Sequence, residues 1–387
     1  MRICKLAGFS VACVLASYRV FTIIGAVLLL NASSFAQSFS FVTIDVPCSP
    51  APPLNCPDGV APRTALGGIN PGGDIGGVYT DGVGKQHGFR LSGYRLTTTG
   101  VPGTLTLAGG EFATIDVPAN LVQPGAPPDE TLPTVIRGIG VSGDLVGSFT
   151  APYNPPLSTT APVDSATYCP SIGSAACIKG VVYSRGKFSP VLFPGHPGAI
   201  LSTISPDGSM YACLHNYDTM GSMFSAAWIR SGNIFTAVSI SAGGGELSDP
   251  TQSFPCSMHG GAAPDGTVVG FYGDMMNACK TNHGYILQGG VLQTYDVPNS
   301  TSTTIWDINP GHAMAGTYID NSAQRRQHGF LQLPGSAPIT VDAPGTEPFN
   351  AVKTVLQGIN PGGAMVGQYT DIMGHTHGLL ALPVRTN

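Results

Sequence analysis

The chain has few charged residues, and neither sign is in strong excess. Only 10% of its 387 residues are charged, with 17 Lys and Arg against 22 Asp and Glu, and the formal net charge is −5. About 25% is usual for soluble domains. A nucleic-acid-binding surface needs clustered basic residues, so this composition argues against a nucleic-acid partner.

Long apolar segments and amphipathic helical stretches are also missing after the N-terminal region. No later run is apolar for long enough to cross a bilayer as a helix, so no membrane contact is expected there. In contrast, 52 glycines and 33 prolines predict many turns and little helix. A hydrophobic fraction of 42% is enough for a sizeable core.

Residues 1–36 have the features of an export signal. Basic residues accompany the apolar run 20–30, and Ser34-Phe35-Ala36 places small residues where a signal peptidase reads. We therefore expect cleavage after Ala36 and a secreted or periplasmic domain over 37–387. The alternative, an uncleaved anchor, would place Arg19 within the hydrocarbon layer, where a charge is costly.

Seven of the nine cysteines follow the expected cleavage site, and their spacing favours disulfides formed in an oxidising compartment. A structural zinc cluster would need close CxxC pairs or nearby His ligands, and neither occurs. Cys213 is left unpaired. The expected pairs are Cys48 with Cys56, Cys169 with Cys177, and Cys256 with Cys279.

The most informative feature is an internal repeat. Residues 68–81 read GINPGGDIGGVYTD, residues 358–371 read GINPGGAMVGQYTD, and a third copy, DINPGHAMAGTYID, ends at Asp320. Three weaker copies bring the number of modules to six. Their aligned Ile or Ala column falls at Ile69, Ile139, Ile204, Ala262, Ile308 and Ile359.

Each module predicts four short strands. The first ends in the Gly-Ile-Asn phrase, and a tight turn follows in which Pro fixes φ and the last Gly takes a positive φ. The second strand is the Val-Gly-x-Tyr-Thr-Asp phrase, and the third begins His-Gly-aromatic. The fourth closes with a phrase such as Thr-Ile-Asp-Val-Pro at residues 114–118.

The two ends of the domain complement each other. It begins with a fourth-type strand, 41–47, and ends with a third-type strand, 377–382. Pairing of the first strand into the last sheet would complete that sheet and remove open edges. The sequence thus predicts an all-β fold, namely a six-bladed β-propeller of four-stranded antiparallel blades closed by the N-terminal strand. An open β-solenoid, the alternative, would leave both end strands exposed.

These phrases resemble the HAF family of bacterial extracellular repeat proteins, named for a His-Ala-Phe tripeptide next to a Gly-Ile-Asn phrase. The resemblance covers nearly all of residues 37–387. Here Gly replaces the middle Ala, and modules two and three lack the His. The resemblance implies export and repeat structure, and it implies no catalytic residue.

An Asp and a His occur together in four of the six modules, at the end of the second strand and the start of the third. We expect the carboxylate to accept a hydrogen bond from the imidazole across the loop, which fixes the loop and the ring tautomer. A repeated structural clamp is the favoured interpretation, and a ring of catalytic or metal-binding pairs is the alternative. The pairs are Asp81 with His87, Asp274 with His283, Asp320 with His328, and Asp371 with His377.

The two edges of the expected blades differ. The turns between strands one and two and between strands three and four are short and share one edge, while the long connections and all three cysteine pairs share the other. Loops on a rigid scaffold usually carry recognition, so we expect the binding face at the long-connection edge. Its polar and aromatic candidates are Tyr153, Tyr168, His215, Tyr217 and His259.

Together these patterns favour a secreted binding or structural module without a cofactor, with an extracellular glycan or protein as partner. The alternative is an extracellular hydrolase or lyase that acts on polysaccharide with a pocket on the same face. His375-Thr376-His377 could bind a metal, but His377 already belongs to a repeated pair, so no metal site is expected.

Overall fold

The computed structural model describes residues 38–51, 53–56, 58–151, 177–193, 198–205, 208–217, 223–232, 234–238, 258–273 and 280–384. They belong to the unit Ser38–Asn387. The expected signal peptide, residues 1–36, lies outside the described residues. Within the described part of the chain, no helix has the length and apolarity that a membrane span requires.

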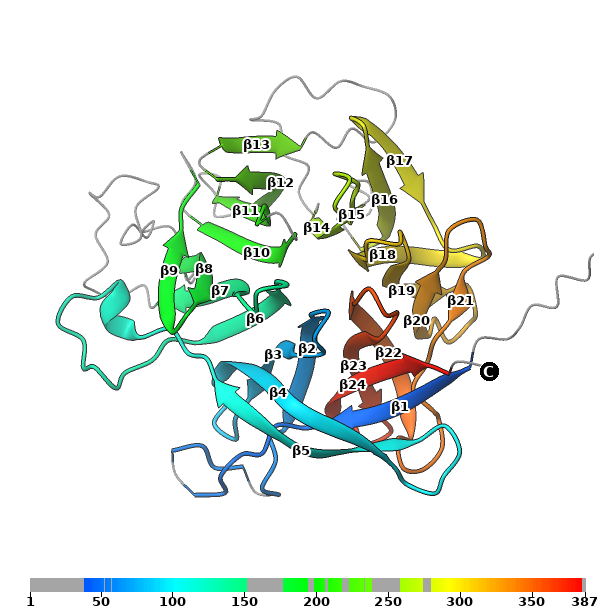
Figure 1. Cartoon of the computed structure of the whole chain (residues 1–387), viewed down its shortest axis with the longest axis horizontal. Coiled ribbons are helices and arrows are strands. Elements are labelled where there is room, and N and C mark those ends of the chain that lie inside the picture. The colour runs from blue at the N-terminus through cyan, green and yellow to red at the C-terminus, as the bar shows by residue number, and fades with distance from the viewer. Residues whose placement is uncertain are drawn as a thin grey trace, which may run out of the picture. The chain divides into compact units, whose positions relative to one another are not determined.

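The described residues form 24 strands and one short 3-10 helix, Ala119–Leu121 (Figure 1). Four separate antiparallel sheets have four strands each, in chain order. The first two are β6 Thr134–Ile139, β7 Leu145–Ala151, β8 Cys177–Ser184 and β9 Lys187–Val191; and β10 Gly198–Ile204, β11 Met210–Tyr217, β12 Met223–Ser231 and β13 Ile234–Val238. The others are β14 Met258–Ala262, β15 Val268–Gly273, β16 Asn282–Gln288 and β17 Val291–Tyr295; and β18 Ser300–Ile308, β19 Met314–Asp320, β20 Gln327–Gln332 and β21 Ile339–Thr340.

The fifth sheet has eight strands, in the order β22-β23-β24-β2-β3-β4-β5, with β1 also paired to β24. Its two halves are linked by the parallel pair Arg63 with Thr376, and a parallel bridge also joins Phe41 of β1 to Thr104, just before β5. The fold is therefore an all-β propeller, in which four separate four-stranded sheets occur where six were expected. The eight strands are β1 Phe39–Ile44, β2 Arg63–Ile69, β3 Ile75–Thr80, β4 Gln86–Thr98, β5 Leu105–Thr114, β22 Ala351–Ile359, β23 Met365–Asp371 and β24 Thr376–Pro383.

The predicted pairing of the first strand with the last is confirmed. β1 runs antiparallel to β24, with Val42 opposite Leu380, and the backbone N–H of Val384 donates to the carbonyl of Ser38 over 2.8 Å. Val42 and Ile44 are 0% and 2% exposed. The N-terminal strand thus contributes both backbone hydrogen bonds and apolar burial to the last sheet.

In three modules the glycine of the second strand makes room for the aromatic ring of the third strand. A Cβ at Gly77 would lie 2.4 Å from the carbonyl oxygen of Ala65 and 2.7 Å from the Phe89 ring, distances that real Cβ atoms do not show. Phe89 itself has no exposed area. The same crowding recurs at Gly270 beneath Tyr285 and at Gly316 beneath Phe330. Close packing of strand on strand therefore explains why these phrases repeat.

The first of the three expected disulfides is confirmed. Cys48 and Cys56 are bonded to each other in the connection between β1 and β2, with Cα atoms 5.7 Å apart. Cys169, Cys256 and Cys279 lie outside the described residues. Cys177 begins β8 and Cys213 lies within β11, and only the backbone of these two residues is described.

Candidate functional site

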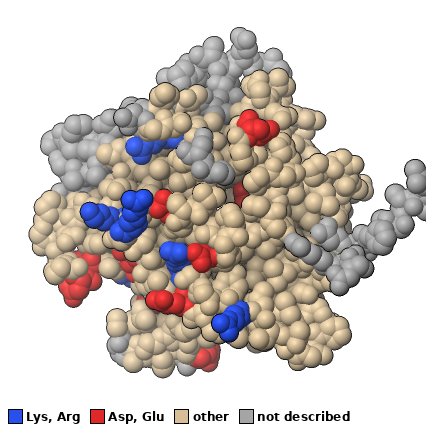
Figure 2. Space-filling view, viewed as in Figure 1, with Lys and Arg blue, Asp and Glu red and all other residues tan. Residues whose placement is uncertain are grey.

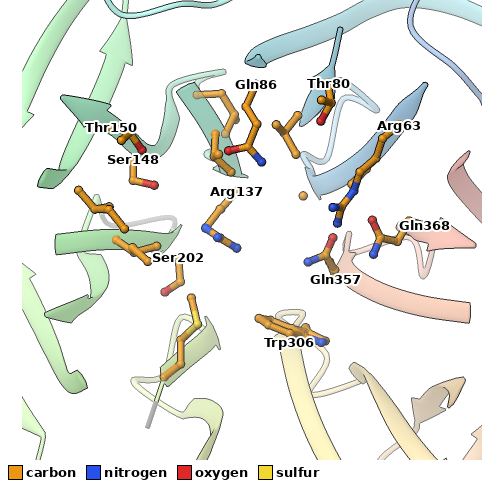
Figure 3. Close-up of a pocket in the computed structure, with 18 of the residues that line it drawn as sticks. Arg63, Thr80, Gln86, Arg137, Ser148, Thr150, Ser202, Trp306, Gln357 and Gln368 are labelled. Atoms are coloured by element: carbon orange, nitrogen blue, oxygen red, sulfur yellow. The ribbon is translucent and has the colours of Figure 1, made fainter. Parts of the chain in front are cut away.

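The inner strand of each module, β2, β6, β10, β14, β18 or β22, faces a common centre (Figure 1). A cavity of about 250 Å³ lies there, lined by residues of all six strands (Figure 3). Each module contributes the residue two places before its Ile or Ala column. This ring consists of Gly67, Arg137, Ser202, Gly260, Trp306 and Gln357.

Two members of this ring are glycines because the neighbouring strand lies too close for a side chain. A Cβ at Gly67 would lie 2.8 Å from the backbone of Arg137, and a Cβ at Gly260 would lie 2.5 Å from the carbonyl oxygen of Trp306. The other four positions carry four different side chains, although the phrase that follows them is repeated. The fold therefore fixes where these residues lie and leaves their chemistry free to differ.

The described lining of the cavity combines aliphatic side chains with polar and basic ones. Its only charged residues are Arg63 and Arg137, and no carboxylate belongs to it. Figure 3 shows both guanidinium groups directed towards the centre, with Gln357 and Gln368 beside Arg63. The Trp306 ring borders the same space and packs against Phe271, with ring centroids 5.3 Å apart. Two guanidinium groups, amides and an indole together suit an anionic ligand with a flat face.

Part of the cavity lining lies at the long-connection edge of the sheets. Arg63 begins β2, Gln86 begins β4 and Thr80 ends β3, and all three line it. The long connections join the ends of second strands to the starts of third strands, or they lead into the starts of first strands. Residues of the strands build the described lining of the cavity, and the tyrosines and histidines named from the sequence do not belong to it.

Charged side chains are sparse elsewhere as well. Figure 2 shows one face on which most of the surface belongs to uncharged residues, with the Lys, Arg, Asp and Glu side chains in a few groups. Some charged residues form ion pairs, and one of these pairs joins Arg90 to Asp74 over 2.5 Å. Against this background, two arginines that line one cavity form a local concentration of basic side chains.

One buried carboxylate lies among the inner strands. Asp307 replaces the Gly of the Gly-Ile-Asn phrase, and its Oδ2 accepts the backbone N–H of Ile359 over 2.8 Å. Its Oδ1 accepts the N–H of Ile308. Burial raises the pKa of Asp307 to about 7, against the lowering effect of these two bonds. Asp307 joins β18 to β22 and is not among the residues that line the cavity.

The predicted Asp–His contacts are present at three modules. The distance from the histidine Nε2 atom to the aspartate Oδ2 atom is 3.2 Å for His87 and Asp81, 3.4 Å for His328 and Asp320, and 3.5 Å for His377 and Asp371. The fourth predicted partner, Asp274 of His283, lies outside the described residues. These contacts connect the start of each third strand to the end of the second.

A second carboxylate, which the sequence reasoning missed, binds the other nitrogen of each ring more closely. It belongs to the phrase that closes the fourth strand. The Nδ1 distances are 2.6 Å for His87 to Asp116, 2.8 Å for His283 to Asp296, 2.6 Å for His328 to Asp342 and 2.8 Å for His377 to Asp45.

The tyrosine of the second strand and the threonine of the fourth complete this unit. Each Tyr lies directly opposite the His in the sheet, and Tyr79 stacks on His87 with ring centroids 4.8 Å apart. Its hydroxyl lies 3.2 Å from the hydroxyl of Thr114. The same contacts recur in Tyr272 with Thr294, Tyr318 with Thr340, and Tyr369 with Thr43. The repeated Thr-x-Asp spacing was the available signal for this network.

Opposing effects act on the imidazole of His87. Burial lowers the pKa of this group, but hydrogen bonds and the negative charges of Asp116 and Asp81 outweigh burial and hold the pKa above its usual value. In His377 the hydrogen bond to Asp45 is the largest effect and raises the pKa. Both rings are therefore held by carboxylates in a fixed orientation.

The prediction that His259 belongs to the binding face is wrong. His259 has no exposed area, its Nδ1 lies 2.5 Å from the hydroxyl of Tyr285, and burial lowers its pKa to about 3. The reason is the alternation of side chains along β14, since Met258 and Gly260 face the cavity and His259 faces the opposite side. His215 and Tyr217 lie in β11 with only their backbone described, and Tyr153 and Tyr168 lie outside the described residues.

Neither a protein-family model nor a curated protein matches the chain. Among solved structures, TolB from Acinetobacter baumannii is 9% identical with a TM-score of 0.40, over 80% of this chain and 63% of that chain. Trypanosoma rangeli sialidase in complex with the inhibitor DANA is 9% identical with a TM-score of 0.45, over 88% and 57%. Penicillium chrysogenum alpha-L-arabinanase complexed with arabinobiose is 10% identical with a TM-score of 0.43, over 89% and 98%. This chain thus spans less than two thirds of the length of TolB and of the sialidase.

Proposed function

We propose that the protein is an exported binding module that holds an anionic saccharide unit in its axial cavity. The observation that carries this proposal is the pair Arg63 and Arg137 in a cavity whose described lining contains no carboxylate. Guanidinium groups bind carboxylate and sulfate oxygens through charge-assisted hydrogen bonds. Uronic acid or sulfated sugar units provide such groups.

The size and remaining lining of the cavity support a single sugar unit. Its volume of about 250 Å³ is below the roughly 300–1,000 Å³ of pockets for drug-sized ligands. Gln357, Gln368 and Ser202 offer amide and hydroxyl groups, and the Oε1 atom of Gln368 is buried without a hydrogen-bond partner among the described residues. Trp306 adds an aromatic surface on which a sugar ring can pack.

An oligosaccharide panel tests the proposal. We expect uronic-acid or sulfated oligosaccharides to raise the melting temperature and to give saturable calorimetric titrations, whereas neutral oligosaccharides of the same length do neither. Arg137→Gln and Arg63→Gln should each weaken binding at least tenfold, because a hydrogen bond to a charged group contributes about 1.5–3 kcal/mol. The matched control is Arg95→Gln, which removes an exposed arginine of β4 that is not part of the cavity lining.

Two results would contradict this function. One is equal binding of neutral and anionic oligosaccharides. The other is an affinity that Arg137→Gln and Arg95→Gln reduce by the same factor, because a general loss of positive charge would then account for the effect.

The alternative, a polysaccharide hydrolase or lyase, has weaker support. Such chemistry needs a general acid or base that faces the ligand. The described lining contains no Asp, Glu, His or Tyr, and the oxygens of Asp307 are occupied by backbone N–H groups. A binding role therefore fits the described cavity better.

We also propose that the propeller has six blades, one for each repeat module, and that the chain is a member of the HAF repeat family. The eight-stranded sheet divides into β2–β5 and β22–β24 with β1, because the links between the halves are the single pair Arg63 with Thr376 and the bridge of Phe41 to Thr104, whereas full ladders of pairs join the strands within each half. A crystal structure tests this count. Six separate sheets around one axis would support it, and a continuous eight-stranded sheet would contradict it.

Export through a cleaved signal is part of the same proposal. The Cys48–Cys56 bond supports it, since disulfides persist in oxidising compartments. Mass spectrometry of the mature protein tests the cleavage. We expect the chain to begin at Gln37, and a full-length chain retained in the membrane would contradict it.

A further inference from the structure

Module six adds a second imidazole to its Asp–His contact. The Oδ2 atom of Asp371 lies 3.5 Å from Nδ1 of His375 and 3.5 Å from Nε2 of His377. The three atoms lie within 4.8 Å of one another. Two imidazole nitrogens and one carboxylate oxygen therefore lie close together beside the start of β24.

These separations match those of ligands around a tetrahedral zinc ion. Zn–N and Zn–O distances are about 2.0–2.2 Å, so two ligand atoms of a tetrahedral site are separated by about 3.3–3.6 Å. Both Asp–His separations are 3.5 Å and fall in this range. The nitrogens of the two imidazoles lie within 4.8 Å of each other, and His375 is exposed enough to adjust its position, with 64% of its side-chain area accessible.

Neighbouring groups already orient two of the three ligands. Nδ1 of His377 lies 2.8 Å from Oδ2 of Asp45, an arrangement that leaves the Nε2 lone pair for a metal when Nδ1 carries the proton. Oδ1 of Asp371 accepts backbone N–H groups from Met373 and His375, which leaves Oδ2 free to coordinate. A carboxylate behind a ligating histidine is the usual outer support of a zinc site.

Comparison of the modules separates this cluster from the general Asp–His contact. The residue two places before the histidine is Lys85 in module one, Thr281 in module four and Arg326 in module five. None of these is a metal ligand under ordinary conditions, and Nζ of Lys85 instead donates to Thr131. Among the modules that carry the contact, module six alone has His at this position.

We propose that Asp371, His375 and His377 form a binding site for a divalent transition-metal ion, with zinc as the expected occupant and a solvent molecule as fourth ligand. Nitrogen and carboxylate donors suit this class of ion. Asp371 and His377 border a surface cavity of about 560 Å³, which provides an entry path from solvent. The sequence interpretation expected no metal site, because it considered His375 and His377 without Asp371 as a third ligand.

Zinc titration of the purified protein tests the site. The protein is first treated with EDTA, and Zn²⁺ alone is then titrated by isothermal calorimetry at pH 7.5 in a buffer that does not bind metals. We expect His375→Lys to weaken the highest-affinity Zn²⁺ binding at least tenfold. Lysine is chosen because module one carries it at the same position, so the variant should fold, and circular dichroism of the metal-free protein checks this.

The matched control is His312→Gly. His312 is an exposed imidazole 3.2 Å from Asp265 in the turn before β19, where other modules have glycine, and it lacks a second histidine. Its removal should leave the Zn²⁺ affinity unchanged. An affinity that is the same in the parent protein and in His375→Lys, or that falls equally in His312→Gly, would overturn the proposal, and so would the absence of any Zn²⁺ binding.

Discussion

The four Asp–His contacts between third and fourth strands differ mainly in burial, and their energies should differ accordingly. The side chains of His87 and Asp116 are 7% and 9% exposed, whereas those of His283 and Asp296 are 34% and 40% exposed. Removal of one partner from a buried pair leaves an uncompensated polar group in a low-dielectric environment. An exposed pair is largely screened by solvent.

The perturbation is Asp116→Ala, with Asp296→Ala as the equivalent change in an exposed module. Asp116→Ala also removes the acceptor of the Gly88 backbone N–H. We expect it to lower the free energy of unfolding by about 3–5 kcal/mol, the usual cost of breaking a buried pair. Asp296→Ala should cost less than about 1 kcal/mol. Urea unfolding followed by circular dichroism measures both values.

The pH dependence gives a second measurement. Because the pKa of His87 in the folded state is held above the usual 6.5, its stabilising contribution is fully present below pH 6.5 and is lost as the pH rises through the folded value. The difference between the parent protein and Asp116→Ala should therefore be larger at pH 6 than at pH 9. A cost below 1 kcal/mol for Asp116→Ala, or a larger cost for Asp296→Ala, would refute the reasoning.

Three further predictions concern burial and cross-links. His259 should remain neutral in the folded protein, because burial lowers its pKa to about 3, so its NMR signals should stay constant from pH 5 to 8; a midpoint near 6.5 would contradict this. Phe39→Cys combined with Pro383→Cys, which lie opposite each other in β1 and β24, should form a disulfide. Loop entropy for ~340 residues sets a ceiling of about 6 kcal/mol, and we expect a gain of about 2–4 kcal/mol in urea unfolding, whereas failure to cross-link in the folded state would contradict the closure. Cys48→Ser with Cys56→Ser should cost about 2–3 kcal/mol, as expected for a separation of eight residues, and an unchanged unfolding midpoint would contradict it.

Much of the fold could be predicted from the sequence, because each repeat specifies its own strands and turns through residues that are close together in the chain. The turn phrases bound the strands, and the mismatch between the strand types at 41–47 and 377–382 predicted the pairing of β1 with β24. The Cys48–Cys56 bond was readable from spacing alone. What repeats along a chain reflects requirements that several modules share, such as the glycine beneath a third-strand aromatic ring in three of them.

The candidate site was harder to predict for the same reason. Residues that line the axis, such as Arg137 and Trp306, occupy equivalent positions at which the residue type differs between modules, and they become neighbours only after the modules are arranged around a centre. The assignment of His259 failed because successive side chains of a strand point to opposite faces. Its neighbours in β14 face the cavity, and His259 itself faces the buried side. The second carboxylate at each histidine, such as Asp116 beside His87, belongs to the repeated Thr-x-Asp phrase. The histidine that it binds lies in another strand, so the phrase alone did not reveal the contact.

The contact between β1 and β24 has a consequence for the order of folding. Val42 of β1 pairs with Leu380 of β24, so β1 has no partner strand until β24 has been synthesised. Until then β1 has unsatisfied backbone groups and an exposed apolar side, a state that invites pairing with other chains. Such a large sequence separation also predicts a slow final step. We therefore expect nascent or C-terminally truncated chains to need protection from aggregation until ring closure.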